Sequence, residues 1–286
     1  MKKIRIIPRL DIKGDFLVKG IHLEGLRILG KPENFAYEYY KNGADEIIYQ
    51  DVVASLYGKN SLLDQIHKVN KKIFIPLTVG GGIRTTIDIK KILKAGADKV
   101  AINTAAVKNP NLITKAARIF GSSTIIVAVE VLKNDKNEYE VFTNNGRERT
   151  KWLVTDWVKE IERRKAGEIL LTSIDKDGTA NGFDFELVKK ISKSVNIPVI
   201  CHGGASNFKD ILDISFDTEV SGVCISSMLH YNLILFNRAF KNEALKCNSN
   251  ILRMSNIDKK KKMFKDTVRI IKKKLNLRKF ITRSIK

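Results

Sequence analysis

Two similar segments that lie 122 residues apart place the strongest constraint on the fold of this chain. IPLTVGGGIR begins at Ile75 and IPVICHGGAS begins at Ile197, so the glycine pair 81–82 corresponds to the pair 203–204. Each segment is a short apolar strand that enters a glycine turn before a helix. Such a turn binds anions, because glycine allows close approach and the helix N-terminus offers unpaired N–H groups. Thr104 and Ser226 follow one strand later, at the same spacing. The repeat therefore predicts two half-barrels, each with a phosphate site.

The rest of the chain alternates short apolar segments with helical patterns. Strands are predicted at residues 3–10, 46–51, 73–79, 99–103, 124–129, 168–172, 198–201 and 222–225, and helices at residues 32–42, 62–70, 86–95, 109–120, 152–165 and 184–195. Strands that are apolar throughout and separated by helices are typical of a parallel sheet buried on both faces. Eight such units predict an α/β fold, a (β/α)8 barrel with a two-fold half-barrel repeat. Residues 133–150 predict a hairpin with its turn at Asn145-Gly146.

Charge divides the chain into two parts. The formal net charge is +21, and residues 251–286 alone hold 14 Lys or Arg and 2 Asp or Glu. We therefore predict a barrel at residues 1–250 and a basic C-terminal extension at residues 251–286. No apolar run approaches the roughly 20 residues of a membrane span, and Arg5 and Asp11 interrupt the N-terminal segment too early for a signal peptide. The three cysteines have no metal-ligand spacing, and buried apolar cysteines are typical of a reducing cytoplasm, where we expect the protein.

Two acidic residues stand at predicted strand ends, where a (β/α)8 barrel carries its functional groups. Asp11 follows the first strand and Glu130 follows the fifth, so the two face each other across the barrel mouth. A substrate held between two phosphate sites would place its middle between these carboxyl groups. One could give a proton and the other take one, if their environments separate their pKa values. The alternative for either acid is a helix cap or an ion pair with a lysine such as Lys19.

Six motifs together resemble the cyclase subunit of imidazole glycerol phosphate synthase, the HisF type of histidine biosynthesis. They are RLDIK at 9–13, LVKG at 17–20, TVGGGIR at 78–84, GADKVAINTAAVKNP at 96–110, GEILLTSIDKDGT at 167–179 and HGGA at 202–205. The resemblance spans about residues 3–235 and implies a (β/α)8 barrel and a lyase. It also implies a heterodimer with a glutaminase subunit of the HisH type, whose ammonia crosses the barrel. The ammonia converts a bis-phosphorylated formimino aminoimidazole carboxamide ribonucleotide to imidazole glycerol phosphate and aminoimidazole carboxamide ribonucleotide.

The resemblance also implies roles for individual residues. Asp11 is the first catalytic acid or base, Glu130 stands at the position of the second, and Lys19 lies on a mobile first loop. The phosphate-binding and substrate-binding residues are Gly82, Asn103 and Thr104 on one side, Asp177, Gly178, Gly203, Gly204, Ser226 and Ser227 on the other, and Thr172 at a strand end. A four-charge ring that gates ammonia is matched by Arg5, Glu46, Lys99 and Glu168, and a glutaminase contact by Asp98. A charged layer that passes no ammonia is the alternative for the ring. No cofactor and no metal ion is expected.

Three positions depart from the family pattern. Glu130 replaces an aspartate, and its extra methylene moves the carboxylate by roughly 1.5 Å. A misplacement of a catalytic group by about 1 Å can slow the reaction by on the order of 10²-fold. His202 replaces a serine, and Arg9 replaces a small residue or cysteine. These changes resemble HisF-like relatives that supply ammonia for acetamidino-sugar formation in surface polysaccharide biosynthesis. The histidine-pathway cyclase is our first hypothesis, and this ammonia-channelling subunit is the alternative.

The basic extension has two interpretations. Apolar residues recur in it with the spacing of one helical face, at Met263, Phe264, Val268, Ile271 and Leu275, between lysine runs at 259–262 and 272–274. A basic amphipathic helix binds an anionic membrane surface or nucleic acid. The alternative is a solvated or partly disordered extension.

Overall fold

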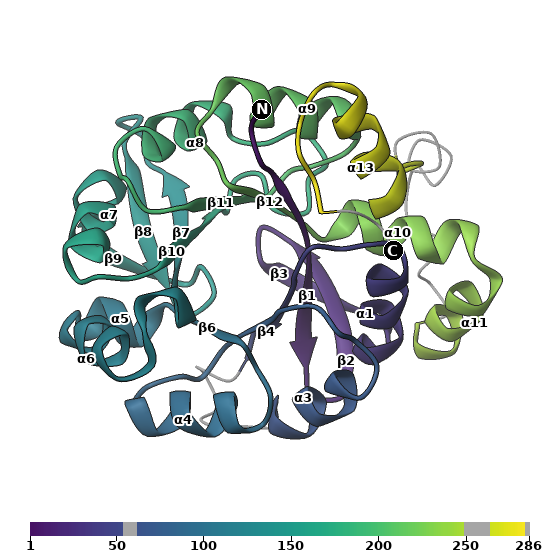
Figure 1. Cartoon of the computed structure of the whole chain (residues 1–286), viewed down its shortest axis with the longest axis horizontal. Helices are drawn as coiled ribbons and strands as arrows, with labels where there is room; N and C mark the ends of the chain where they lie inside the picture. Colours follow the sequence, from purple (N-terminus) through teal and green to yellow (C-terminus); the bar gives the residue numbers. More distant parts are fainter. Residues whose placement is uncertain (54–61, 249–263, 284–286) are drawn as a thin grey trace.

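The computed structural model describes residues 1–53, 62–248 and 264–283, and these form a closed barrel of eight parallel strands (Figure 1). In order around the barrel the strands are β1 (Arg5–Lys13), β4 (Ile47–Asp51), β5 (Leu77–Gly80), β6 (Lys99–Ile102), β7 (Ile125–Lys133), β10 (Glu168–Ser173), β11 (Val199–His202) and β12 (Gly222–Ile225). β12 pairs with β1 in parallel, with Gly222 opposite Arg5, and this pairing closes the barrel. The predicted (β/α)8 fold is confirmed.

Helices cover the outside of the barrel. The described helices are α1 (Pro32–Lys41), α3 (Leu62–Asn70), α4 (Thr86–Lys94), α5 (Thr104–Lys108), α6 (Asn111–Phe120), α7 (Val154–Arg163), α8 (Phe185–Ser192), α9 (Phe208–Asp217), α10 (Ser227–Phe236), α11 (Arg238–Cys247) and α13 (Val268–Leu277), with one 3-10 turn at Ser122–Thr124. The helix predicted at 109–120 corresponds to α6, and α5, which was not predicted, precedes it. Pro110 disfavours a helical conformation for the residue before it, and Asn109 has φ −142° and ψ 87°.

The two halves of the barrel repeat in their backbone conformation. Thr85 and Asn207, 122 residues apart, each begin a helix with a capping box. Asn103 and Ser226 also have nearly the same backbone angles, φ −122° and ψ −88° against φ −120° and ψ −88°, and each precedes a helix. The structural counterpart of Ser226 is therefore Asn103, not Thr104. The second half contains one more residue between its glycine turn and this position.

Two antiparallel hairpins continue the barrel strands at the C-terminal end of the barrel. β8 (Tyr139–Thr143) and β9 (Glu148–Leu153) follow β7, which confirms the hairpin predicted around Asn145-Gly146. β2 (Phe16–Ile21) and β3 (Glu24–Gly30) follow β1. The prediction of a loop at Lys19 is wrong, because Lys19 lies in β2 with a side chain only 2% exposed. Asp11 and Glu130 likewise lie within strands instead of at strand ends, because both strands run on into hairpins.

Apolar side chains fill both sides of the barrel sheet. Outward-facing residues pack against the helices in one large cluster. Inward-facing residues form a smaller cluster halfway along the barrel, at Ile7, Ile48, Ala101, Ile126, Ala128, Leu170, Ile200 and Cys224. Side chains alternate along a strand, so Arg5, Ile7 and Arg9 of β1 point into the barrel at successive levels. The apolar layer thus separates a charged layer at the strand starts from a polar layer at the mouth.

The described part of the C-terminal extension packs on the barrel. α13 lies beside α9 and α10 (Figure 1), and its Val268, Ile271 and Leu275 are buried. Ile281 pairs with the start of the chain, accepting from Ile4 N at 3.1 Å and donating to Lys2 O at 2.9 Å. The predicted helical face is confirmed for these three residues, whereas Phe264, predicted on the same face, is buried but lies before the helix begins. The boundary predicted at residue 250 and the predicted residue Met263 lie outside the described residues. Of the described helices, none is long and apolar enough to cross a membrane.

Candidate active site

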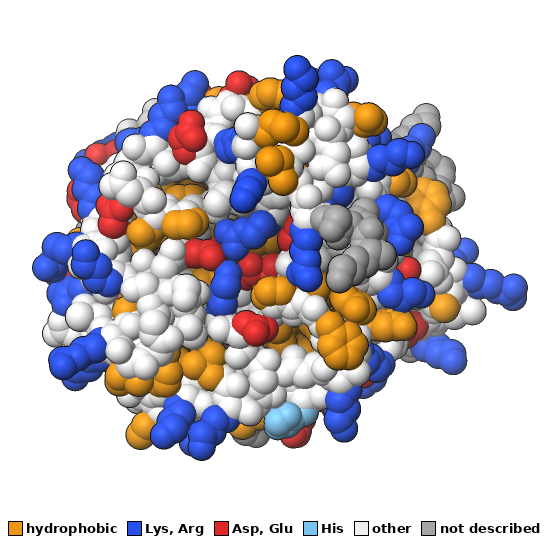
Figure 2. All heavy atoms as spheres, viewed as in Figure 1, with side chains coloured by type: hydrophobic (Ala, Val, Ile, Leu, Met, Phe, Trp, Pro, Cys, Tyr) orange, Lys and Arg blue, Asp and Glu red, His pale blue; other side chains and the backbone are white. Residues whose placement is uncertain are grey.

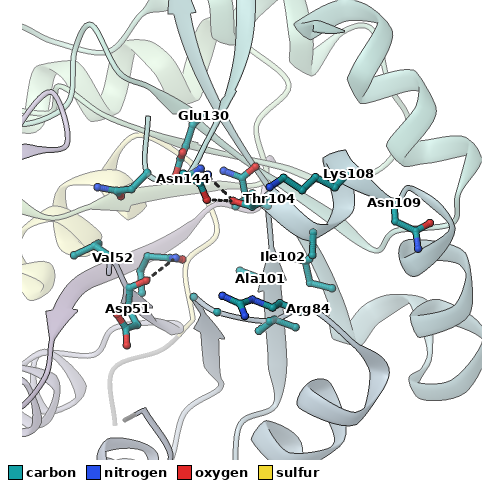
Figure 3. A pocket seen from close by; sticks show the side chains of 18 residues that line it. Asp51, Val52, Arg84, Ala101, Ile102, Thr104, Lys108, Asn109, Glu130 and Asn144 are labelled. Atoms are coloured by element: carbon teal, nitrogen blue, oxygen red, sulfur yellow. Dashed lines mark hydrogen bonds between the residues drawn. The ribbon is translucent and has the colours of Figure 1, made fainter. Parts of the chain in front are cut away.

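A cavity of about 400 Å³ opens at the C-terminal ends of β4, β5, β6 and β7 (Figure 3). Four of the predicted site residues line it, namely Gly82, Asn103, Thr104 and Glu130. The cavity also reaches the small side chains of Ala101 and Ala128, which belong to the apolar layer of the barrel interior. The mouth of the barrel is therefore hollow on the side of the first half-barrel.

The first glycine turn forms a wall of this cavity. Gly81 and Gly82 have φ values of +107° and +67°, which residues with a Cβ rarely adopt. The Thr104 hydroxyl accepts from Asn144 N at 3.1 Å. Arg84 and Lys108, which we did not predict as site residues, also line the cavity and are exposed. Cations and backbone N–H groups together suit a phosphate group. Arg84 lies within the motif TVGGGIR and Lys108 within GADKVAINTAAVKNP, so these two motifs could have indicated both residues as site residues.

The space beside the second glycine turn is much smaller. The predicted residues Asp177, Gly178, Gly203, Gly204, Ser226 and Ser227 surround a space of only about 10 Å³, about the room of one water molecule. The β2–β3 hairpin packs against two of the residues that line this space. Gly178 lies so close to the hairpin that an added Cβ would be 2.4 Å from Gly20 O, and His22 N donates to Asp177 O at 2.9 Å. The structure thus brings the predicted residues together beside the hairpin.

Asp11 is held in a buried network of ion pairs. Arg9 Nε donates to Asp11 Oδ1 at 2.8 Å, and Lys19 Nζ donates to Asp11 Oδ2 at 3.0 Å. Lys19 Nζ also lies 2.9 Å from both carboxylate oxygens of Asp177. Burial opposes ionisation, but the charges of Arg9 and Lys19 outweigh it and hold the pKa of Asp11 well below its usual range. Asp11 is therefore a carboxylate at neutral pH, and the ion pair with Lys19 that the sequence left open is present.

Glu130 has the opposite electrostatic environment. Its side chain lines the cavity, and Gly146 N donates to Glu130 Oε2 at 2.9 Å. Burial raises the pKa of Glu130 to about 7, against the opposing charge of Arg9. Glu130 can therefore hold a proton at neutral pH while Asp11 is ionised. A pair of carboxyl groups whose pKa values are separated in this way can divide the roles of acid and base.

Thr172 lines neither of these two cavities. Its Oγ1 atom lies 3.3 Å from Arg9 Nη1, and Nδ1 of His202 lies at the same distance from that nitrogen. His202 also lines the second, smaller space. The predicted substrate residue Thr172 thus contacts Arg9 in the polar layer.

The four charges predicted at the strand starts form a closed ring. Arg5 contacts Glu46 at 3.1 Å and Glu168 at 2.9 Å, and Lys99 contacts the same two glutamates at 3.2 Å and 2.9 Å. Figure 2 shows acidic and basic side chains together at the centre of one face, around the barrel axis of Figure 1. The Thr78 hydroxyl donates to Glu46 Oε1 at 2.6 Å from inside the barrel. The ring closes the barrel at the end opposite the cavity.

Asp98, the predicted partner contact, lies next to this ring in the chain. One of its carboxylate oxygens accepts from Leu77 N at 2.8 Å, so this side chain also fixes the start of β5. Among the residues that the structure describes, no cluster of His, Cys, Asp or Glu could hold a metal ion.

The family described as histidine biosynthesis protein matches residues 5–234, which contain the whole barrel and all the site residues above. The chain belongs to this family. Three relatives are named imidazole glycerol phosphate synthase subunit HisF. The protein of Legionella pneumophila is 53% identical over 210 residues, which are 73% of this chain and 99% of that protein. The protein of Alkaliphilus metalliredigens is 45% identical over 234 residues, which are 82% of this chain and 93% of that protein. The protein of a Hydrogenobaculum species is 47% identical over 230 residues, which are 80% of this chain and 91% of that protein.

Membership of the histidine biosynthesis family confirms the resemblance that the six motifs carried. It supports the predicted enzyme class, a cyclase subunit of imidazole glycerol phosphate synthase, which is a lyase of histidine biosynthesis. The family match ends at residue 234, so α13 and the rest of the described extension lie beyond it.

Proposed function

We propose that this cyclase uses Glu130 as its acid and Asp11 as its base, on a bis-phosphorylated substrate that spans the barrel mouth. The observation that carries the proposal is the pair of carboxyl groups between two glycine turns at equivalent positions of the half-barrels, with the pKa of Asp11 lowered and that of Glu130 raised to about 7. The first turn, with Arg84 and Lys108, would bind one phosphate. Asp177, Gly178 and the second turn would bind the other. We further propose that the enzyme works in the cytoplasm.

The β2–β3 hairpin must move for this substrate to bind at both ends. Lys19 covers Asp11, and the second space has room for about one water molecule only. A phosphate that enters there would compete for Lys19 with the carboxylates of Asp11 and Asp177. The same movement would expose Asp11 to the substrate. Lys19 would then serve the reaction as a substrate-binding cation.

The pH dependence of turnover tests these roles. The pKa of Glu130 is raised to about 7, so the protonated acid is present below that pH and is lost above it. The pKa of Asp11 is lowered, so this base stays ionised throughout the neutral range. We expect turnover with ammonium salts, measured at a constant concentration of free ammonia, to fall by about tenfold per pH unit above pH 7. Glu130→Gln should remove this dependence together with most of the activity. A flat profile in the wild type would contradict the assignment.

We propose that ammonia enters through the four-charge ring from a glutaminase subunit docked over it, with Asp98 at the contact. The name of the relatives, a synthase subunit, supports a complex of this kind. The ring holds each cation between two anions, so ammonia could pass only if at least one of these ion pairs opened. The apolar layer above the ring would then conduct neutral ammonia and exclude ammonium ions, whose charge could not be solvated there.

Lys99→Met tests the gate. It removes one cation from the ring and retains most of the side-chain length. We expect turnover with ammonium salts to stay near the wild-type value. With glutamine and the glutaminase partner, we expect less product to form for each glutamine hydrolysed. Lys94→Met, at an exposed end of α4, is the control. An equal fall in both activities would mean that Lys99 supports the barrel structure and is not part of a gate.

A second function, ammonia supply for acetamidino-sugar formation, is favoured by the small volume of the second space and by the buried Arg9–Asp11 ion pair. A barrel that only conducts ammonia needs no second phosphate site. The deciding assay supplies the bis-phosphorylated substrate and ammonium to the wild type and to Glu130→Asp. Turnover in the wild type supports the histidine-pathway cyclase. Turnover gained only in Glu130→Asp indicates a cyclase site that has been weakened, and no turnover in either folded protein supports the conduit.

In the described part of the extension, the predicted binding to a membrane would have to depend on charged side chains. The apolar residues Val268, Ile271 and Leu275 that would insert into a bilayer are buried against the barrel. Arg269, Lys273 and Arg278 remain exposed and would bind an anionic surface electrostatically. Binding to anionic vesicles that disappears at high salt would support this role, and equal binding by a charge-reversed extension would contradict it.

A further inference from the structure

Arg9 occupies the centre of the polar layer and contacts two other barrel strands and the turn that follows a third. Its side chain is buried and points into the barrel from β1, with Nε on Asp11 and Nη1 between Thr172 and His202. Its own carbonyl oxygen accepts from the Ser226 hydroxyl of the β12–α10 turn at 3.0 Å. Thr172 and His202 come from β10 and β11. Arg9 is thus fixed at both its backbone and its guanidinium group.

The hydrogen bonds around His202 have only one consistent arrangement. The Ser226 hydroxyl gives its single hydrogen to Arg9 O, so it can only accept from His202 Nε2, 3.1 Å away. His202 then carries its proton on Nε2, and its Nδ1 accepts from Arg9 Nη1. The ring is neutral, in agreement with burial and the charge of Arg9, which lower the pKa of His202 to about 3. His202 and Ser226 therefore orient the guanidinium without adding charge.

The buried charges that face Arg9 balance only when Arg9 is present. The titratable groups that face Arg9, Asp11 and Glu130 are Lys19, Asp177, His202 and Cys224, together with His230 from α10. Arg9 and Lys19 offset Asp11 and Asp177. Burial lowers the pKa of His202 and of His230 to about 3, so both rings are neutral. Burial raises the pKa of the Cys224 thiol, so it is also neutral. Glu130 is then the one group of this set whose ionisation changes its net charge. Without Arg9, one negative charge would be uncompensated before Glu130 ionised.

We propose that Arg9 is a positioning residue of this site, which orients the Asp11 carboxylate and supplies the buried positive charge that divides the acid and base roles between Glu130 and Asp11. The roles themselves rest on the proposed function, whereas the charge balance does not. Arg9 acts through Asp11 and Glu130 and lines neither the main nor the second cavity.

The test separates the charge of Arg9 from its shape. Side-chain carboxyl carbons of glutamate are labelled with ¹³C, the Glu130 signal is assigned with Glu130→Gln, and its titration is followed by NMR. In Arg9→Met we expect the midpoint of the Glu130 titration to rise by about one pH unit. This is the low end of the range of pKa shifts expected when a nearby opposite charge is lost. In Arg9→Lys it should stay near the wild-type value. Turnover of Arg9→Lys should still fall, because lysine lacks the planar fork that contacts Asp11, Thr172 and His202 together.

Each outcome of this test decides one question. An unchanged Glu130 titration in folded Arg9→Met overturns the proposal. If Arg9→Met does not fold, Arg9→Gln, which keeps polar contacts without the charge, takes its place in the same titration. A role in folding alone would lower turnover in all variants with the same pH profile, and would also overturn the proposal. If the titration moves as expected but no variant turns over the bis-phosphorylated substrate, Arg9 sets the charge of the site and the proposed cyclase function fails instead.

Discussion

Replacement of Asp11 by asparagine is expected to reduce turnover with ammonium salts by about 10² to 10⁴-fold, the usual contribution of a positioned acid or base. Asparagine keeps the shape of the side chain and one oxygen that accepts hydrogen bonds. It removes the carboxylate that Arg9 and Lys19 hold ionised, so it cannot take a proton. The measurement is steady-state formation of imidazole glycerol phosphate at saturating ammonium, which does not need the glutaminase.

Two controls separate chemistry from folding in this experiment. Asp11→Asn leaves Arg9 and Lys19 facing Asp177 alone, so some stability should be lost, and urea unfolding shows whether the variant is folded under assay conditions. Asp175→Asn changes an acid two residues from Asp177 that lines neither the main nor the second cavity, and its turnover should stay near the wild-type value. Wild-type turnover in folded Asp11→Asn would remove this residue from the mechanism and leave Glu130 as the only acid–base group.

The barrel itself could be predicted from the sequence because its strands are apolar on both faces. β12 and α3 have the predicted bounds, and the repeated glycine turns lie at equivalent positions of the two half-barrels. The β2–β3 hairpin could not be predicted in this way. Phe16–Ile21 is a short strand with Lys19 near its centre, and a charged residue there indicates a loop. Lys19 is buried only because Asp11 and Asp177, from β1 and the turn after β10, supply its counter-charges.

The candidate site was predictable in its members and less so in its chemistry. The positions of Asp11 and Glu130 followed from the predicted strand ends, although both strands extend further. Their protonation depends on neighbours distant in sequence. Burial raises the pKa of Glu130 to about 7, although the hydrogen bond from Gly146 in the β8–β9 hairpin opposes this shift. Arg9 was recognisable as unusual, but its role as partner of Asp11 depends on Thr172 and His202, which lie 163 and 193 residues away.

The C-terminal extension could also be predicted only in part, because its contacts depend on residues distant in sequence. Helical periodicity correctly indicated Val268, Ile271 and Leu275 as one apolar face. It could not say that the barrel covers this face, or that Lys272 would be completely buried. By sequence, Lys272 is one of three consecutive lysines and indicates a solvated face. Its partner Asp45 lies 227 residues earlier, in the turn before β4, and no local pattern connects the two.

Lys272→Met is therefore expected to destabilise the whole barrel by about 3–5 kcal/mol, the cost of leaving one member of a buried ion pair without its partner. Lys272 Nζ lies 2.6 Å from Asp45 Oδ1 and 2.8 Å from Gly43 O. The other oxygen of Asp45 accepts from Ile6 N in β1 at 2.8 Å, so the pair joins α13 to the first barrel strand. The measurement is the urea midpoint of unfolding, which should fall in a single cooperative transition.

Lys273→Met is the matched control for Lys272, because the two lysines are adjacent in α13 and only Lys273 is exposed. We expect its stability to lie within about 0.5 kcal/mol of the wild type. Asp45→Asn combined with Lys272→Met should cost less than the sum of the single changes, since the buried charge left by one is removed by the other. Equal stability of Lys272→Met and Lys273→Met would mean that the extension rests on the barrel without supporting it. The expected difference would instead make residues 264–283 a structural part of the barrel, although the family match ends at residue 234.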